Sequence, residues 1–107
     1  MSKLPLEHVR AVVLTQAWSG AVTTQLLGDM GAEAIQVEPL PWKRLDSWRG
    51  AYRPQDATAA YPNDDPGERP YNRNANFNTV SRNKHSVPLN LDTPQGRDLF
   101  LKLVEVA

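Results

Sequence analysis

The chain has 107 residues, enough for one domain with a modest core. Twelve basic residues balance twelve acidic ones, and this neutrality argues against a general nucleic-acid or membrane-surface binder, because both need an excess of positive charge. The absence of cysteine excludes disulfides, thiolate catalysis and cysteine-based metal sites.

The sequence also argues against export and membrane insertion. The first ten residues lack a charged segment followed by an apolar one, and no apolar run approaches the roughly 20 residues that span a bilayer. We therefore expect a soluble, cytoplasmic protein. The two histidines, His8 and His85, are far apart in the sequence, and we interpret them as surface residues rather than metal ligands.

Residues 9–38 predict a β-α-β unit. Residues 9–14 form an apolar run of strand length that is rich in β-branched side chains. Residues 20–30 predict a helix, which Gly31 ends in the left-handed conformation that glycine adopts most easily. The apolar side chains of this helix share one face: Val22, Leu26, Leu27 and Met30. Residues 34–38 resume a strand, and a connection of this kind predicts two parallel strands.

Residues 39–80 predict a long loop. Six prolines lie between Pro39 and Pro70, and no periodicity persists, although residues 43–48 could form a short helix. Loops of this length in a small domain are usually functional or disordered. Between Lys43 and Lys84 eight basic residues accompany five acidic ones, a local charge of +3, together with several aromatic rings. The segment is interpreted either as a solvated loop or as a surface for an anionic, ring-bearing ligand such as a nucleotide.

Regular structure returns at residues 86–91, where apolar and polar side chains alternate as in a half-buried strand. Pro88 lacks a backbone N–H and indicates an edge strand or a bulge. Thr93 is a suitable N-cap, and Pro94 a suitable first residue, for a helix over residues 94–106. Together the elements predict an α/β fold: a single, truncated, Rossmann-like three-layer domain over residues 1–107 with parallel strands.

No standard catalytic motif is present in the sequence. It has no G-x-G-x-x-G after the first strand, no phosphate-binding loop and no G-x-S-x-G. The corner at residues 16–20 lies where open α/β sheets bind ligands, beyond a strand and ahead of a helix N-terminus. Backbone amides of Ser19, Gly20 and Ala21 can point at an anion there, and ordinary turn chemistry explains the same residues equally well.

Four further residues carry specific expectations. Gly28, inside the predicted helix, indicates close backbone packing. Asp29, near the end of that helix, is expected to contact solvent or a neighbouring strand rather than to act as a catalytic acid. Arg82 and Lys84, just before the last strand, are well placed to meet a phosphate.

Three separate blocks of the chain together resemble one family. The blocks are V-V-L-T-Q-A-W-S-G-A from residue 12, L-L-G-D-M-G-A-E-A-I-Q-V-E-P from residue 26 and N-T-V-S-R-N-K-H-S-V-P-L-N-L-D-T-P-Q-G-R from residue 78. Their order and spacing resemble the amino-terminal part of the family III coenzyme A transferases, the carnitine and formyl-CoA transferase type. The likeness covers nearly the whole chain.

The resemblance implies a site and a reaction. It places Gln16, Ala17 and Trp18 beside the adenine or pantetheine part of coenzyme A, and Lys84 near the phosphates. Members of the family transfer CoA between carboxylic acids through an aspartate that lies downstream of the matched blocks. Their fold is a Rossmann-like domain within an interlocked, ring-shaped homodimer.

This chain departs from the family pattern at several positions. Ser19-Gly20-Ala21 stands in place of Ala-Gly-Pro, Gln36 in place of lysine, His85 in place of arginine and Asn90 in place of aspartate. Several of these changes remove charge from positions that could touch an anion.

Three hypotheses follow from these observations. The chain is a truncated or stand-alone amino-terminal domain, inactive alone, that binds CoA, acyl-CoA or a related nucleotide. Alternatively it is a non-catalytic module that forms homodimers, or one half of a split CoA-transferase completed by a complementary chain.

Overall fold

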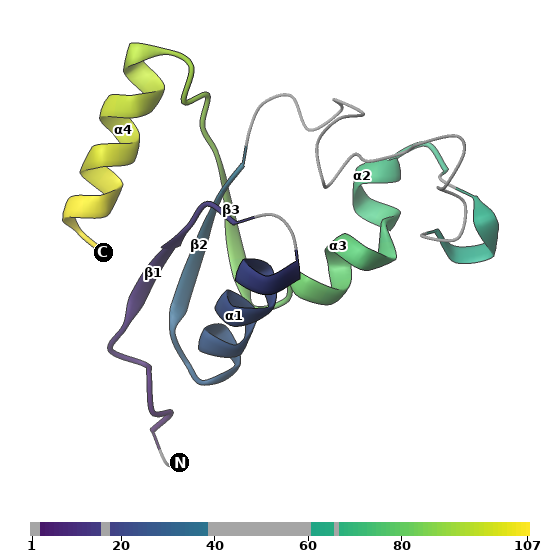
Figure 1. Cartoon of the computed structure of the whole chain (residues 1–107), viewed down its shortest axis with the longest axis horizontal. Coiled ribbons are helices and arrows are strands. Elements are labelled where there is room, and N and C mark those ends of the chain that lie inside the picture. Colours follow the sequence, from purple (N-terminus) through teal and green to yellow (C-terminus); the bar gives the residue numbers. More distant parts are fainter. Residues whose placement is uncertain (1–2, 16–17, 39–60, 66) are drawn as a thin grey trace.

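The computed structural model describes residues 3–15, 18–38, 61–65 and 67–107. Figure 1 shows the elements in chain order. They are β1 (Arg10–Val13), α1 (Trp18–Asp29), β2 (Glu33–Glu38), the 3-10 helix η2 (Pro62–Asp64), α2 (Pro70–Arg73), α3 (Ala75–Val80), β3 (Lys84–Pro88) and α4 (Pro94–Glu105).

The three strands form one parallel sheet in the order β1-β2-β3. Ala11 pairs with Ala34, and Gln36 pairs with Val13 on one side and Ser86 on the other. The predicted α/β class with three parallel strands is therefore confirmed. The Rossmann-like, three-layer architecture and the single-domain assignment stay predictions.

Helix α1 ends just before Gly31, as the sequence predicted. The amide of Ala32 donates to the Leu27 carbonyl and the amide of Gly31 to the Gly28 carbonyl, both at 3.0 Å, which is the Schellman pattern. Gly31 has a φ of 104°, in the region that favours glycine. This turn sends the chain directly from α1 into β2.

The face that α1 buries differs from the predicted apolar stripe. Ala21 and Gln25 are buried, whereas Leu26 and Met30 are about half exposed. Small residues on the buried face allow a close approach to neighbouring backbone. Gly28 shows this directly, because a Cβ built there would lie 2.9 Å from the Asn83 carbonyl oxygen. The predicted packing role of Gly28 is confirmed.

The described end of the predicted loop is helical, so the irregular assignment is wrong for residues 70–80. Side-chain hydrogen bonds stabilise this segment, whose sequence has no periodic pattern of apolar residues. Asn74 caps α3 by accepting from the Phe77 amide at 3.1 Å, and the Arg73 guanidinium donates to the carbonyls of Asp65 and Pro62. Phe77 and Val80 are buried. Residues 62–64 of the segment form η2. Residues 39–60 and 66 lie outside the described part, and so does the helix considered at 43–48.

Strand β3 begins and ends earlier than the predicted 86–91. Asn83 has a φ of 58° and turns the chain so that pairing starts at Lys84. Pairing ends at Pro88, on an edge strand of the described sheet, as its missing N–H predicted. A turn follows, in which the Asn90 side chain accepts from the Asp92 amide at 3.0 Å.

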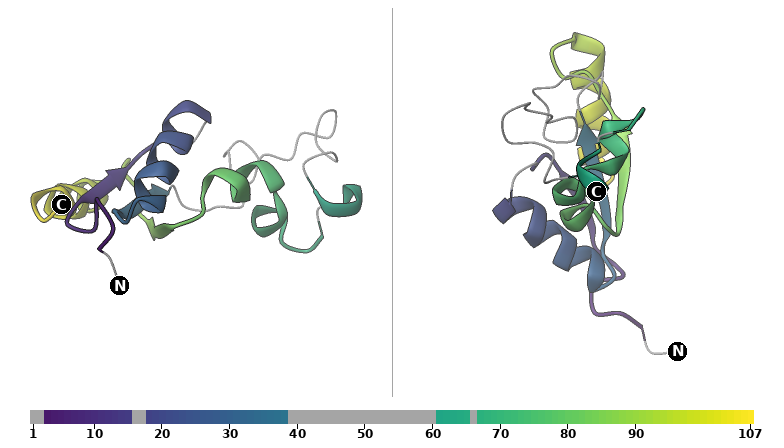
Figure 2. Two further views of the ribbon diagram at one scale, coloured as in Figure 1. Left: turned by 90° about the horizontal axis from the view of Figure 1, so that it is seen from below. Right: turned by 90° about the vertical axis from the view of Figure 1, so that its right-hand side faces the viewer.

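Helix α4 follows its sequence signals closely. Thr93 caps it by accepting from the Gly96 amide at 3.1 Å, and Pro94 is its first residue. Figures 1 and 2 show α4 and the α2–α3 segment at opposite ends of the molecule, with the sheet and α1 between them. Arg10 of β1 reaches the end of α4 by donating to the Val106 carbonyl at 2.8 Å.

We predict that Gly28→Ala destabilises the protein. Alanine has the better helix propensity by about 0.5–1 kcal/mol, but its Cβ would press on backbone that must shift, at a cost of about 1–3 kcal/mol. Urea unfolding should therefore show a net loss for Gly28→Ala. Thr23→Ala, at an exposed position of the same helix, is the control and should change stability little. Equal stability of the two variants would contradict the close packing.

Candidate functional site

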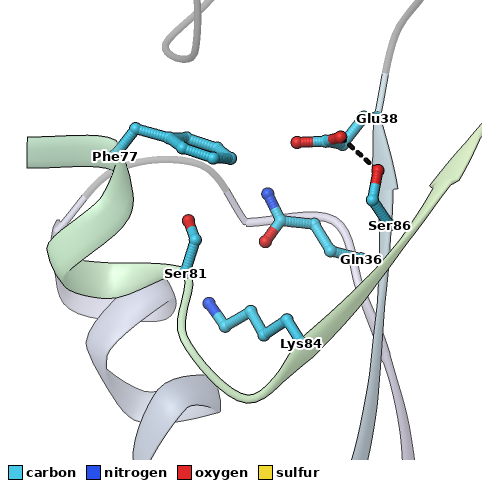
Figure 3. Close-up of a pocket in the computed structure, with 6 residues that line it drawn as sticks. All are labelled: Gln36, Glu38, Phe77, Ser81, Lys84 and Ser86. Carbon is cyan, nitrogen blue, oxygen red and sulfur yellow. Dashed lines mark hydrogen bonds between the residues drawn. The ribbon is translucent and has the colours of Figure 1, made fainter. Parts of the chain in front are cut away.

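A polar cavity of about 110 Å³ lies between α3 and the sheet. Figure 3 shows the six side chains that line it: Gln36, Glu38, Phe77, Ser81, Lys84 and Ser86. Four come from β2 and β3, and the other two from α3 and the residue that follows it. Gln36 and Glu38 belong to the second half of β2, whereas Ser86 is the middle residue of β3 and Lys84 its first residue. The cavity therefore lies beside the first half of β3 and reaches the carboxyl end of β2 only.

The strand register explains why these polar residues gather on one face. Side chains alternate along a strand, so Gln36 and Glu38 share a face of β2, and Lys84 and Ser86 share a face of β3. Because Gln36 pairs with Ser86, the two polar faces coincide. Parallel strands that are covered on both faces are normally apolar. Buried Gln36 and Glu38 thus depart from the expected pattern at a point where a ligand can bind.

Glu38 and Ser86 are joined across the ladder. The Ser86 hydroxyl donates a hydrogen bond to the Glu38 carboxylate (Figure 3). The bond joins the two side chains at the wall of the cavity.

Lys84 is half-buried and points across the cavity toward α1. Its ammonium donates to the Ala21 carbonyl at 2.9 Å, within the first turns of α1. Burial lowers the pKa of Lys84 below its usual 10.5, because removal from water disfavours the charged form. In the described part of the chain no carboxylate forms an ion pair with this ammonium. A cation in this situation attracts an anion.

Arg82 does not line the cavity, and the expectation that it meets a phosphate stays a prediction. Its guanidinium donates to the Asp29 carboxylate at 3.0 and 3.4 Å. With its amide oxygen turned toward Arg82, Gln25 also accepts from the guanidinium, at 2.6–2.9 Å. The hydrogen bonds from Arg82 lower the pKa of Asp29. Asp29 is thus a contact to the turn before β3, as its place near the helix end suggested.

Two of the four predicted site residues, Trp18 and Lys84, lie in the described part of the chain. Trp18 is the first residue of α1 and is about half exposed, and Lys84 contacts the same end of that helix through Ala21. Gln16 and Ala17 lie outside the described residues. The amides of Ser19, Gly20 and Ala21 are among the first four of α1, which have no partner within a helix.

Five lining residues were missed from the sequence: Gln36, Glu38, Phe77, Ser81 and Ser86. A signal existed for the first two, since they flank Val37 with polar side chains in a strand that reads as buried. Ser86 follows Lys84 at the spacing that places both on one face. Phe77 gave no signal, because its helix was not predicted.

Two negative findings complete the description. Within residues 3–15, 18–38, 61–65 and 67–107, no group of three histidine, aspartate or glutamate side chains is arranged to hold a metal ion. In the same ranges, every helix is too short or too polar to cross a membrane.

The fold is an α/β unit in which β2 and β3 contribute four side chains to a polar cavity. Comparison with known families is specific: the sequence model of CoA-transferase family III matches residues 6–107. The chain therefore belongs to CoA-transferase family III.

Similar proteins agree with this assignment. The chain is 36% identical over 102 residues to a succinyl-CoA:mesaconate CoA-transferase of Haloarcula marismortui, covering 95% of this chain and 22% of the relative. It is 34% identical to a succinyl-CoA–D-citramalate CoA-transferase of Chloroflexus aurantiacus, covering 94% and 21%. A crystal structure of a Mycobacterium tuberculosis protein described as hypothetical matches with a TM-score of 0.59 and 28% identity, covering 94% and 22%. The chain spans about a fifth of the length of these relatives and resembles their amino-terminal portion.

We predict that the Lys84 ammonium titrates below 10.5 in the folded protein. Because the folded state then holds the proton less tightly than the unfolded state, the contribution of Lys84 to stability rises with pH between its folded pKa and 10.5. NMR of the lysine side chains gives the folded value, and the same resonance in urea gives the reference. Lys84→Met should lack this pH-dependent gain in the free energy of unfolding. A folded pKa at or above the urea value would contradict the burial of the ammonium.

Proposed function

We propose that this chain forms the amino-terminal part of a CoA site in a family III CoA-transferase, binds CoA weakly, and does not transfer CoA alone. The observation that carries the proposal is Lys84, a half-buried cation with no ion-pair partner among the described residues, which lines a polar cavity between α3 and the parallel strands β2 and β3. The phosphates of CoA can pair with the ammonium of Lys84, and the amides of its pantetheine arm can form hydrogen bonds with the polar side chains of the cavity.

The charges and rings near Lys84 suit the nucleotide end of CoA. An ammonium attracts phosphate as a point charge, and the amides of the first turn of α1, which have no partner within the helix, add partial positive charge on the same side. The half-exposed indole of Trp18 offers a surface on which adenine can stack. Gln16 and Ala17 are proposed to border the same region because of the family resemblance.

The size of the cavity limits how much of CoA it holds. Pockets that enclose a drug-sized ligand measure about 300–1,000 Å³, and this one measures about 110 Å³. It accommodates a few atoms of the pantetheine arm, whose amide groups can donate to Glu38 and accept from Gln36 or Ser81. Most of the ligand would lie outside it, and we therefore expect millimolar rather than micromolar affinity.

Transfer of CoA requires more than binding. The family resemblance implies a covalent step on an aspartate downstream of the matched blocks, and covalent catalysis needs that nucleophile positioned at the acyl group. A chain that spans a fifth of its relatives is accordingly proposed to bind without reacting. Incubation with succinyl-CoA and mesaconate should yield no mesaconyl-CoA, and turnover by the purified chain would refute this part of the proposal.

CoA titration followed by amide NMR tests the binding. We predict shifts centred on residues 18–21, 77 and 84–86, saturating at millimolar CoA. Lys84→Ala should weaken binding about tenfold, because it removes a charge-assisted interaction. Lys102→Ala, in the last turn of α4, removes the same charge elsewhere and should have no effect. No response at millimolar CoA would overturn the binding proposal.

A second candidate function is association with another copy or a complementary chain, and the surface of α4 favours it. Leu99, Leu101 and Val104 are 45–58% exposed. Exposed apolar side chains on one helix commonly mark an interface. A Chloroflexus aurantiacus relative, 29% identical over 103 residues, is named an alpha subunit of a succinyl-CoA–L-malate CoA-transferase.

Light scattering distinguishes the two candidates. If the chain associates with itself through α4, the purified protein is a dimer, and Leu101→Glu shifts it toward the monomer because a buried charge is costly. Gln95→Glu, at an exposed position of the same helix, should leave the dimer intact. A monomer at high concentration would rule out self-association.

A further inference from the structure

The end of α1 is tied to the start of β3 by one carboxylate. Asp29, the last residue of α1, accepts from Arg82 at 3.0 and 3.4 Å and from the Asn83 side chain at 2.5 Å. Arg82 and Asn83 immediately precede Lys84, the first residue of β3. Three hydrogen bonds thus join segments that lie more than fifty residues apart in the sequence.

The backbone at this junction is held closely as well. Asn83 has a φ of 58°, a conformation that few residues adopt without support. Its carbonyl oxygen lies so near Gly28 that a Cβ there would approach it to 2.9 Å. The turn therefore has little freedom to slide along α1 while Asp29 holds it.

The Lys84 side chain starts at this junction and ends near the other end of α1. Its backbone follows Asn83, and its ammonium reaches the Ala21 carbonyl at 2.9 Å. Ala21 and Asp29 are eight residues apart in the helix, a rise of about 12 Å. Any displacement of the turn relative to α1 would therefore move the ammonium away from the cavity and from the start of the helix.

We propose that Asp29, Arg82 and Asn83 act as a latch, a set of positioning residues that holds Lys84 at the cavity. The latch would not touch the ligand itself. The effect of the latch on CoA rests on the function proposed above, whereas its effect on Lys84 does not.

The exposed fractions of the Arg82 and Asp29 side chains distinguish a positioning role from a purely structural one. The side chains of Arg82 and Asp29 are 58% and 29% exposed, and exposed ion pairs add little to stability. The latch should thus matter more for the placement of one side chain than for the melting of the whole protein. Gln25 supports it, since its amide bridges Arg82 and the Thr79 carbonyl of α3.

The decisive measurement is the pKa of Lys84 by side-chain NMR in ligand-free Asp29→Ala. We expect it to rise toward 10.5 as the released side chain enters water. Glu33→Ala is the matched control, because it removes a similarly exposed ion pair, with Arg10, on the opposite face of the sheet. If Asp29→Ala fails to fold, Arg82→Met, which removes two of the three hydrogen bonds to Asp29, gives the same readout.

Binding supplies a second, independent readout. Asp29→Ala should weaken CoA binding roughly two- to fivefold, and should weaken it no further in a Lys84→Ala background, because the latch acts through the lysine. An unchanged Lys84 pKa in Asp29→Ala, an equal change in Glu33→Ala, or additive losses in the double variant would each overturn the latch. If no variant and no wild-type protein responds to CoA, the proposed function fails while the Lys84 pKa still decides the latch.

Discussion

The parallel ladder between β2 and β3 is the constraint on which the candidate site depends. Its register pairs Gln36 with Ser86 and Ala34 with Lys84, and it thereby brings the polar faces of two strands together. A shift of one residue in either strand would turn its polar side chains to the other face. The cavity exists because this register is combined with α3, which contributes Phe77 to its lining.

The register is set from outside the sheet as much as within it. Pairing begins directly after Asn83, whose left-handed turn is fixed against α1 by Asp29 and by the close approach of Gly28. At its other end the ladder extends to Pro88, and its last hydrogen bond runs from the Leu89 amide to the Glu38 carbonyl at 3.0 Å. Helix α1 thus aligns β3, and β3 in turn carries Lys84 and Ser86 to the cavity. Burying Gln36 and Glu38 gives up apolar contact that a sheet of this kind normally makes.

The elements that local chemistry specifies could be predicted from the sequence. Three signals depend on neighbouring residues alone: the apolar run at residues 9–14, the glycine after α1 and the Thr93-Pro94 start of α4. Each predicts its element to within a few positions of the observed one. Helix α3 could not be predicted in this way. It is short, without an apolar stripe, and is stabilised by the Asn74 cap and by packing of Phe77 and Val80.

Contacts between distant residues explain the remaining differences. Helix α1 buries Gln25, whose side-chain amide hydrogen-bonds Arg82 and the Thr79 carbonyl. Because these partners are distant in the sequence, no local pattern predicts which face of α1 is buried. For the same reason Arg82 was expected to meet a phosphate although Asp29 neutralises it. Lys84 could be selected as a candidate because its position just before a strand is a local feature, and its contact with phosphate stays a prediction. The other residues that line the cavity could not be predicted, because their placement depends on the strand register and on α3.

The strand faces also show which departures from the family pattern matter. Gln36 lines the cavity, so the lysine of the family pattern at that position would have placed a second cation beside Lys84. His85 lies between Lys84 and Ser86 and therefore faces the opposite side of the sheet, where a change from arginine leaves the charge of the cavity unaltered. Asn90 serves the turn into α4, accepting from the Asp92 amide with its side chain and from the Thr93 hydroxyl with its carbonyl. Of these three changes only Gln36 removes charge from the cavity, and the attraction of an anion to this site consequently depends on Lys84.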